Sequence, residues 1–352
     1  MNKNLLDLSY SEVQSLVHEL NEPNFRAVQL FDWLNKGVKF SEMKNLPKAF
    51  IDKLVNDGYI DQPLQIVQVL ESKIDGTKKY IYKLNDGNVI EGVLMKYKYG
   101  NTICVSTQVG CRMNCAFCAS GLDGLVRNLT AGEILAQVVA VNRDNSEDKK
   151  ERAITNIVLM GSGEPFDNYE NVTKFLQLVN AKEGLNVSLR NISLSTCGLC
   201  NRIYDLADSN LPVTLTISLH APDDETRKKI MPVSNKYGIS DIMKAVKYYF
   251  DKTKRRIVFE YSMIKGVNDT LDHANKLSKL LKGLSCHVNI IALNPVKERG
   301  LNGTNKQSIK EFMDVLIKNN ISCTLRRTMG QDLEGACGQL RRKFIKDNTT
   351  IE

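Results

Sequence analysis

The amino-acid sequence predicts an α/β fold in which a small helical domain and a β-hairpin segment precede a partial (β/α)6 barrel or open parallel sheet. Three observations predict it. Six β-rich runs recur between residues 102 and 294, and helical patterns separate them. The first sixty residues show helical periodicity only. Between these two parts, an Asp-Gly step joins two β-rich runs.

Residues 1–62 are expected to form the helical accessory domain. Ser9-Tyr10-Ser11-Glu12 is a capping box that precedes an apolar helical face. A second apolar face covers residues 27–34 and ends near Gly37, where glycine can close a helix. A third helix is expected to end at Gly58.

Residues 63–98 are expected to form the hairpin extension. The runs KKYIYKL and NVIEGVLMKY are joined by Asn85-Asp86-Gly87, and such steps favour tight turns. Residues 99–328 are expected to form the barrel, and residues 329–352 a C-terminal loop with a basic tail. The six barrel strands are TICVSTQV, ITNIVLMG, NISLSTC, VTLTISLH, RIVFEYSMI and HVNIIALN. Because the strands are parallel, the chemistry should lie at their carboxyl ends.

The composition is that of a globular protein, with 42% hydrophobic and 25% charged residues. The sequence contains no signal peptide and no apolar run long enough to span a membrane, so a cytoplasmic protein without membrane association is expected. Nine cysteines, an odd number, argue against a secreted disulfide framework and favour metal-binding or catalytic thiols.

The net charge of +8 favours polyanionic partners. The excess of Lys and Arg is concentrated in residues 244–256 and 326–346. By charge alone, these two segments are candidates for contacts with nucleic-acid phosphates, and a solvated surface is the alternative interpretation.

Cys111, Cys115 and Cys118 form a C-x-x-x-C-x-x-C motif directly after the first barrel strand. Three thiolates can hold three irons of a 4Fe–4S cluster and leave the fourth iron open. The alternative is a closed zinc site that recruits Cys104 as the fourth ligand. The next strand ends in Gly161-Ser162-Gly163-Glu164-Pro165, a glycine-rich turn.

The segment CRMNCAFC resembles the signature of radical SAM enzymes, in which the open iron chelates S-adenosylmethionine (SAM). That resemblance implies a partial barrel of six βα units. It also implies that the Gly163-Glu164 turn contacts the methionine end of SAM.

Further segments resemble the RNA adenine methyltransferases of RlmN/Cfr type. They are NEPNFRAVQLFDWL, QVGCRMNCAFCASG, MGSGEPFDN, LSTCG, ISLHAPDDETR, KGVNDT, CHVNIIALNP and RRTMGQDLEGACGQL, in the order of that family. The resemblance implies that the helical domain binds RNA. It also implies two SAM molecules per turnover, 23S rRNA and tRNA as substrates, and an electron donor such as flavodoxin or ferredoxin. A monomer is expected.

The resemblance also implies the roles of single residues. Cys337 corresponds to the cysteine that becomes S-methylated, Cys104 to the resolving cysteine that forms a transient disulfide with it, and Glu91 to the proton acceptor. Cys111, Cys115 and Cys118 correspond to the cluster ligands. The positions that correspond to SAM contacts are Gly163, Glu164, Ser195, Ser218, Leu219, His220 and Asn294.

The segments QVGC, ASGLDGLVRNLT and EPFDN resemble the branch that methylates carbon 2 of an adenine in 23S rRNA and in tRNAs. Methylation of carbon 8 of the same rRNA adenine is the alternative within the enzyme class. A zinc-stabilised RNA-binding protein without catalysis is the alternative outside it. Cys197 and Cys200 depart from the family pattern, and their spacing is interpreted as incidental. Cys286 and Cys323 are expected in the core.

Overall fold

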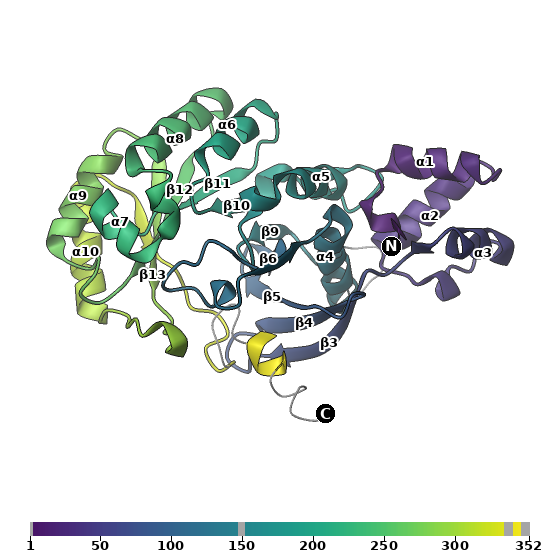
Figure 1. The fold of residues 1–352 in the computed structure, drawn as a ribbon, viewed down its shortest axis with the longest axis horizontal. Coiled ribbons are helices and arrows are strands. Elements are labelled where there is room, and N and C mark those ends of the chain that lie inside the picture. Colours follow the sequence, from purple (N-terminus) through teal and green to yellow (C-terminus); the bar gives the residue numbers. More distant parts are fainter. Residues whose placement is uncertain (1–2, 147–151, 334–340, 346–352) are drawn as a thin grey trace.

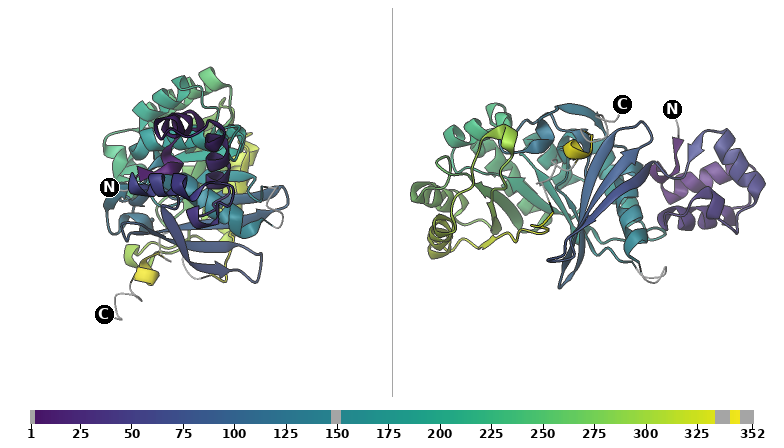
Figure 2. Two further views of the ribbon diagram at one scale, coloured as in Figure 1. Left: turned by 90° about the vertical axis from the view of Figure 1, so that its right-hand side faces the viewer. Right: turned by 90° about the horizontal axis from the view of Figure 1, so that it is seen from below.

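The computed structural model describes residues 3–146, 152–333 and 341–345 (Figure 1). Three short helices make up the N-terminal part, which lies at one end of the molecule, away from α7–α10 at the other end (Figure 2). Their bounds are α1 Tyr10–Glu19, α2 Phe25–Asn35 and α3 Lys48–Asn56, and the two-residue strands β1 Lys3–Asn4 and β2 Tyr59–Ile60 pair beside them.

The capping box predicted at the start of the first helix is confirmed. Ser9 Oγ accepts from Glu12 N, and the Glu12 carboxylate accepts from Ser9 N. Gly37, just beyond α2, has a φ of +67°, a conformation that costs glycine little. Local capping chemistry therefore fixes the ends of these helices.

A sheet of ten strands organises the rest of the described chain. Its order is β14-β13-β12-β11-β10-β9-β6-β5-β4-β3, a linear order that does not close into a ring. The strands are β3 Leu64–Glu71, β4 Lys78–Leu84, β5 Val89–Tyr97, β6 Gly100–Cys104, β9 Asn156–Leu159, β10 Ile192–Thr196, β11 Thr214–Ser218, β12 Ile257–Met263, β13 Cys286–Ala292 and β14 Cys323–Leu325. All neighbours from β6 to β14 are parallel. The predicted parallel sheet is confirmed.

Helices connect the parallel strands and bury the core against the sheet. They are α4 Ala131–Asn145, α5 Tyr169–Asn180, α6 Cys200–Asp208, α7 Asp224–Ile230, α8 Ile239–Thr253, α9 Leu271–Leu281 and α10 Lys306–Lys318. The second predicted capping box is confirmed at the start of α4, between Thr130 and Glu133. Within the described residues, no helix is both long enough and apolar enough to cross a membrane.

The structure differs from the sequence-based expectation at three places in the sheet. The expected hairpin extension is a meander of three antiparallel strands, β3–β5, that continues the main sheet through β6. The first expected barrel strand is divided, since the chain leaves the sheet after Cys104 and residues 108–110 (β7) pair instead with residues 125–128 (β8). A seventh parallel strand, β14, was not expected, because three partly exposed residues give no periodic signal.

Candidate active site

The three cysteines of the C-x-x-x-C-x-x-C motif lie on the loop between β7 and β8, beyond the carboxyl end of β6. Two backbone hydrogen bonds hold this loop. Cys111 N donates to Gly124 O at 2.8 Å, and Ala116 N donates to Ile230 O at 2.8 Å, at the end of α7. The loop is thus attached both to the β7–β8 ribbon, the strand pair that it connects, and to α7, the helix that follows β11.

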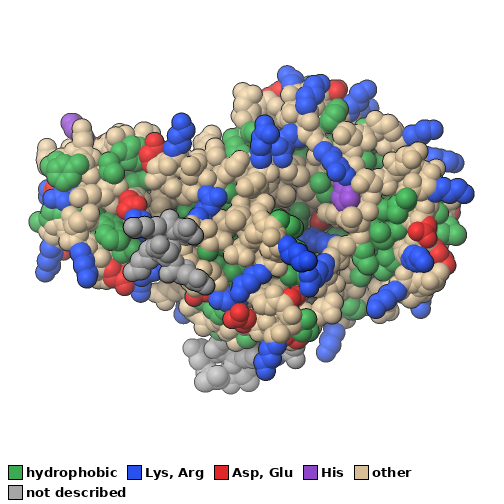
Figure 3. Space-filling model, turned by 180° about the vertical axis from the view of Figure 1, so that it is seen from behind, with side chains coloured by type: hydrophobic (Ala, Val, Ile, Leu, Met, Phe, Trp, Pro, Cys, Tyr) green, Lys and Arg blue, Asp and Glu red, His purple; other side chains and the backbone are tan. Residues whose placement is uncertain are grey.

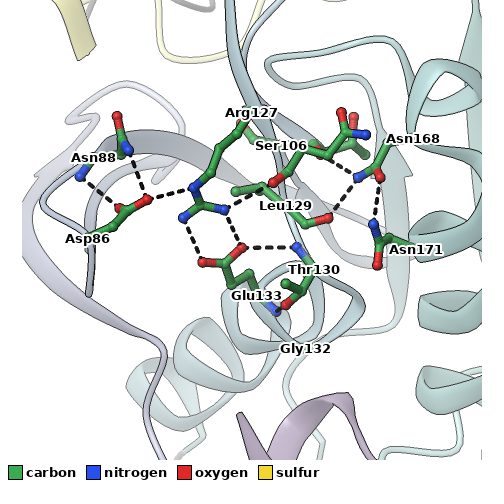
Figure 4. Close-up of polar contacts among 12 residues, drawn as sticks. Asp86, Asn88, Ser106, Arg127, Leu129, Thr130, Gly132, Glu133, Asn168 and Asn171 are labelled. Carbon is green, nitrogen blue, oxygen red and sulfur yellow. Dashed lines mark hydrogen bonds and ion pairs between the residues drawn. The ribbon is translucent and has the colours of Figure 1, made fainter. Parts of the chain in front are cut away.

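The ribbon itself is fixed by a charged network around Arg127 on β8 (Figure 4). The Arg127 guanidinium donates to Asp86 at 2.6 Å, in the turn between β4 and β5, and to both carboxylate oxygens of Glu133 on α4 at 2.8 Å. Burial alone would raise the pKa of Asp86, but the hydrogen bonds from Arg127 and Asn88 outweigh it and lower that pKa to about 2. One arginine therefore connects the cysteine ribbon to two neighbouring elements.

The cysteine loop has donors of the right chemistry for a cluster. Burial is the main cause that raises the pKa of Cys111 to about 12, and burial also raises the pKa of Cys115. Thiolates at these positions therefore need a bound cation, such as iron, to stabilise them. The charges of Cys111, Cys115 and Cys118 also act on one another.

The arrangement of these thiols bears on the zinc alternative. Among the described residues, no three His, Cys, Asp or Glu side chains converge as ligands of a single metal ion. A tetrahedral zinc gathers its ligands around one point, whereas a cluster spreads three thiolates over three irons. A cluster with one open iron needs only the three thiols of this loop, whereas a closed zinc site would need a fourth ligand.

A residue that sequence reasoning missed, Arg227 on α7, lies fully buried beside this loop. Its guanidinium donates to the carbonyl oxygens of Cys197 at 2.6 Å, Ser218 at 3.1 Å and Leu219 at 3.0 Å. It also donates to Ser234 Oγ at 2.9 Å. The side chain therefore ties the carboxyl ends of β10 and β11 together.

The charge of Arg227 matters as well as its hydrogen bonds. Its cation interacts electrostatically with the thiols of Cys115 and Cys197. Burial lowers the pKa of Arg227, although arginine stays protonated because its ordinary pKa is so high. The segment DETRKK is typical of a solvated helix, so only the fold reveals a fixed positive charge at this place.

The turn that resembles a SAM contact, Gly163-Glu164, follows β9. Gly163 has a φ of +110°, and a Cβ there would lie 2.8 Å from Gln108 N, so the position requires glycine. The Glu164 carboxylate is buried and accepts from Cys197 N at 2.8 Å and Phe166 N at 3.1 Å. Burial raises the pKa of Glu164. Its side chain is thus used within the protein to join the ends of β9 and β10.

The expected SAM positions on β10 and β11 lie side by side. Ser195 Oγ and Ser218 Oγ are 3.3 Å apart, from neighbouring strands. His220 is buried, and its Nδ1 accepts from Ser262 N at 3.0 Å. Burial, together with the charge of Arg227, lowers the pKa of His220 to about 3, so the imidazole is neutral.

A cavity of about 340 Å³ opens at the carboxyl ends of the strands. Cys104, Cys118 and Asn294 line it together with an ion pair in which Arg326 contacts Glu260 at 2.8 Å. Burial raises the pKa of Cys104 to about 11, so this thiol is protonated at neutral pH. The cavity therefore brings a second, isolated thiol to the edge of the cysteine loop.

Glu91, the expected proton acceptor, lies buried on β5. Its carboxylate accepts from Arg341 N at 3.0 Å, at the start of the helical residues 341–345. Cys337 itself lies outside the described residues. On the other side of it, the Asp332 carboxylate accepts from Ser72 Oγ at 2.5 Å. The described residues before and after Cys337 are thus attached to the β3–β5 meander.

The remaining cysteines of the described chain form no disulfides, although the backbone of Cys197 belongs to the site through its hydrogen bonds with Glu164 and Arg227. All eight cysteines among the described residues are free thiols. Cys197 and Cys200 are buried at the end of β10 and the start of α6, so their CGLC spacing forms no disulfide. Cys286 is buried in the core as expected, and Cys323 packs against the core from a partly exposed position.

Comparison with known proteins identifies the class first. Residues 105–277 match the Radical SAM superfamily, and residues 3–60 match the ribosomal RNA large subunit methyltransferase N-terminal domain. A solved structure of a radical SAM methyltransferase from Sphaerobacter thermophilus superposes with a TM-score of 0.91 at 40% identity, covering 96% of this chain and 98% of that one. The fold and the cysteine loop are those of a radical SAM enzyme.

Full-length relatives narrow the class to a family. The "probable dual-specificity RNA methyltransferase RlmN" of Clostridium botulinum strain Eklund 17B is 53% identical over 349 residues, 99% of each chain. The protein of the same name in Clostridium perfringens strain SM101 is 53% identical over 346 residues, 98% of each chain. The chain therefore belongs to the RlmN family of radical SAM RNA methyltransferases, as its sequence motifs predicted.

Proposed function

We propose that this enzyme methylates carbon 2 of adenine 2503 in 23S rRNA and of adenine 37 in tRNAs. The observation that carries the proposal is the cavity at the carboxyl ends of the strands, where the cysteine loop meets the separate buried thiol of Cys104. The full-length similarity to proteins named dual-specificity RNA methyltransferases supports the carbon-2 reaction over the carbon-8 alternative.

Cys111, Cys115 and Cys118 would hold three irons of a 4Fe–4S cluster, and SAM would bind the fourth. When bound, the reduced cluster and SAM supply a carbon radical and a methyl group. The chain would hold SAM with the Gly163-Glu164 turn and with the ends of β10, β11 and β13, the last through Asn294. The fixed charge of Arg227 stabilises anionic groups near the loop.

The thiol of Cys104 would resolve the covalent intermediate that Cys337 forms with RNA. Its sulfur attacks the Cys337 sulfur, an S–S bond forms, and the bond between the Cys337 sulfur and the methylene carbon on the RNA breaks. The electron pair of that bond stays on the carbon, which takes up a proton and becomes the methyl group of the product. An external two-electron reductant then restores both thiols. Because the pKa of Cys104 is raised to about 11 by burial, a base must take its proton first.

Glu91 would accept a proton in this reaction. Its carboxylate lies next to β6, and its charge acts on the thiol of Cys104. The hydrogen bond from Arg341 N orients this carboxylate. The same hydrogen bond supports an additional role of Glu91 in positioning the C-terminal segment, because it attaches the chain after Cys337 to β5.

The substrate and setting follow from the same proposal. Lysine and arginine side chains are spread over the face in Figure 3 and rim its central hollow, which suits an RNA substrate. We further propose a monomeric, cytoplasmic enzyme that receives electrons from a flavodoxin- or ferredoxin-type protein.

Replacement of Cys104 by Ala tests the proposal. After anaerobic cluster loading, this variant should still cleave SAM reductively but accumulate a covalent protein–RNA adduct, visible as a band of reduced mobility in a denaturing gel. Cys286→Ala, which removes a buried thiol distant from the cavity, is the matched control and should turn over normally. Normal turnover by the Cys104 variant would contradict its resolving role.

A further inference from the structure

The amino ends of the parallel strands, opposite the cysteine loop, carry a second pocket, of about 660 Å³. Four of its described lining side chains are basic, Arg190, Lys254, Arg255 and Arg256, and none of the described ones is acidic. They come from the segments that lead into β10 and β12. Because all strands from β6 to β14 run in parallel, these connections meet at one edge of the sheet.

The pocket lies on the same face of the sheet as the proposed SAM positions. Thr214 pairs with Ser193, two residues before Ser195, and Val258 pairs with His287. Alternation along a strand therefore puts Thr214 of the pocket and Ser195 of the active site on one face. The pocket and the active site therefore lie at opposite ends of one row of Ser and Thr side chains on this face of the sheet.

In the described part of the chain, the pocket's cations have no carboxylate partners, and Arg256 donates to Ser322 Oγ at 3.0 Å. Among the described residues, none of the four takes part in an ion pair, whereas Lys252, just before them, pairs with Asp208 at 3.2 Å. Arg255 donates to Thr214 Oγ1 at 2.8 Å, but its buried Nε has no partner among the described groups. The four basic side chains that line the pocket therefore favour an occupant that brings acceptor oxygens.

His287, which also lines the pocket, has hydroxyl partners at both ring nitrogens. Its two ring nitrogens lie 2.9 Å from Ser322 Oγ and 2.9 Å from Thr324 Oγ1. Partial burial, and then the charge of Arg256, lower the pKa of His287. The positive charge of the pocket therefore comes mainly from its lysine and arginine side chains.

The chemistry of the lining selects the ligand. Arginine forks match the oxygens of a phosphate. The described lining contains no Phe, Tyr or Trp ring on which a base could stack. Its basic rim is open, with Arg190, Lys254 and Arg256 all exposed. These features suit the sugar–phosphate backbone better than an enclosed nucleotide.

We propose that this pocket binds backbone phosphates of the RNA substrate, away from the adenine that is methylated. The proposal rests on the proposed function, in that it extends the RNA contact of that enzyme to the opposite end of the sheet. It also distinguishes two kinds of residue within the basic segment 244–256. Arg255 and Arg256 line the pocket, whereas Lys252 on α8 forms an ion pair.

The test is the salt dependence of RNA binding by the full chain without SAM. Arg190→Gln combined with Arg256→Gln removes two exposed cations, so the fold should persist with an unchanged Tm. Each phosphate contact contributes about 0.7–0.9 to the slope of log Kd against log salt. For substrate tRNA and an rRNA fragment, the slope should fall by about 1.5.

Lys310→Gln combined with Lys318→Gln is the matched control. It removes the same charge from exposed positions on α10, outside the pocket, and should change the slope less than half as much. Equal slopes for the two double variants would overturn the proposal. So would tight binding of free pyrophosphate, lost in the pocket variant while RNA binding stays intact, because it would make this a small-anion site.

The RNA-binding test of the pocket and the test of the proposed methylation can fail independently. Binding is measured here without catalysis, and methylation is followed separately by nucleoside analysis of the wild-type reaction. A wild type that binds RNA with the predicted slopes but methylates no adenosine would contradict the proposed function alone.

Discussion

The arginine side chains at the two ends of the parallel sheet differ in burial and in hydrogen-bond partners. At the carboxyl end, Arg227 is fully buried and bonded to three backbone carbonyls. At the amino end, Arg190 and Arg256 are exposed and have no carboxylate partner among the described residues. A buried cation with several hydrogen bonds is a fixed part of the scaffold, whereas exposed cations without a carboxylate partner remain available to a ligand. Burial and partners, more than charge, therefore distinguish the two ends.

The largest expected effect is at the carboxyl end. Cys115→Ser should lower the iron and sulfide content after anaerobic reconstitution by at least about tenfold, since a cluster ligand is lost. Cys286→Ser, at the amino end of β13, should retain the wild-type content. Equal iron content in both variants would show that the cysteine loop holds no cluster, and zinc in place of iron would favour the RNA-binding alternative.

The arginines provide the next comparison. Arg227→Met should lower the free energy of unfolding by at least about 3 kcal/mol, because it leaves three buried carbonyls unpaired. Arg256→Met at the other end should stay within about 0.5 kcal/mol. Urea unfolding of the cluster-free proteins measures both. A similar loss in the two variants would mean that the ends do not differ as described.

Replacement of a glycine by alanine at each end of the sheet should separate the cost of backbone strain from the cost of steric crowding. Gly163→Ala meets both a positive φ and a contact of 2.8 Å with Gln108 N. It should cost about 2–3 kcal/mol of stability, from strain and crowding together. Gly283→Ala, which precedes β13, shares the positive φ of +82° but meets no atom within 4 Å, so about 1 kcal/mol is expected. Thermal unfolding of both variants checks the difference, and equal losses would exclude crowding at Gly163.

The smallest effect concerns pH. The pKa of His220 is lowered to about 3 by burial and by Arg227, below the ordinary value of 6.5. The unfolded chain therefore binds a proton more readily, and stability that is complete above pH 6.5 is lost as pH falls toward 3. From pH 6.5 to 5.5 the loss should be about 1 kcal/mol.

His220→Asn is the informative variant for that slope, since asparagine tolerates the φ of +56° at this position. It should remove this part of the pH dependence of unfolding. An unchanged slope would show that the folded and unfolded states bind protons equally at His220, so that folding does not lower its pKa.

Much of this arrangement was predictable from sequence. Capping boxes such as Ser9–Glu12 act locally, and the cysteine spacing carries its own chemistry, so both were found without a structure. Arg227 was not, because burial depends on how α7 packs over the ends of two strands that are distant in sequence. The sequence indicated the pocket at the amino ends only through the basic segment 244–256. The sequence pattern could not distinguish Arg256 from the ion-paired Lys252.

The most direct test of the central claim is mass spectrometry of the nucleosides from 23S rRNA and tRNA incubated with the cluster-loaded enzyme, SAM and a reductant. Both RNAs should contain 2-methyladenosine after incubation with the wild type, and neither should contain it after incubation with Cys104→Ala, which stops at the adduct. The appearance of 8-methyladenosine, or of no methylated adenosine from an enzyme with full iron and sulfide content, would contradict this claim.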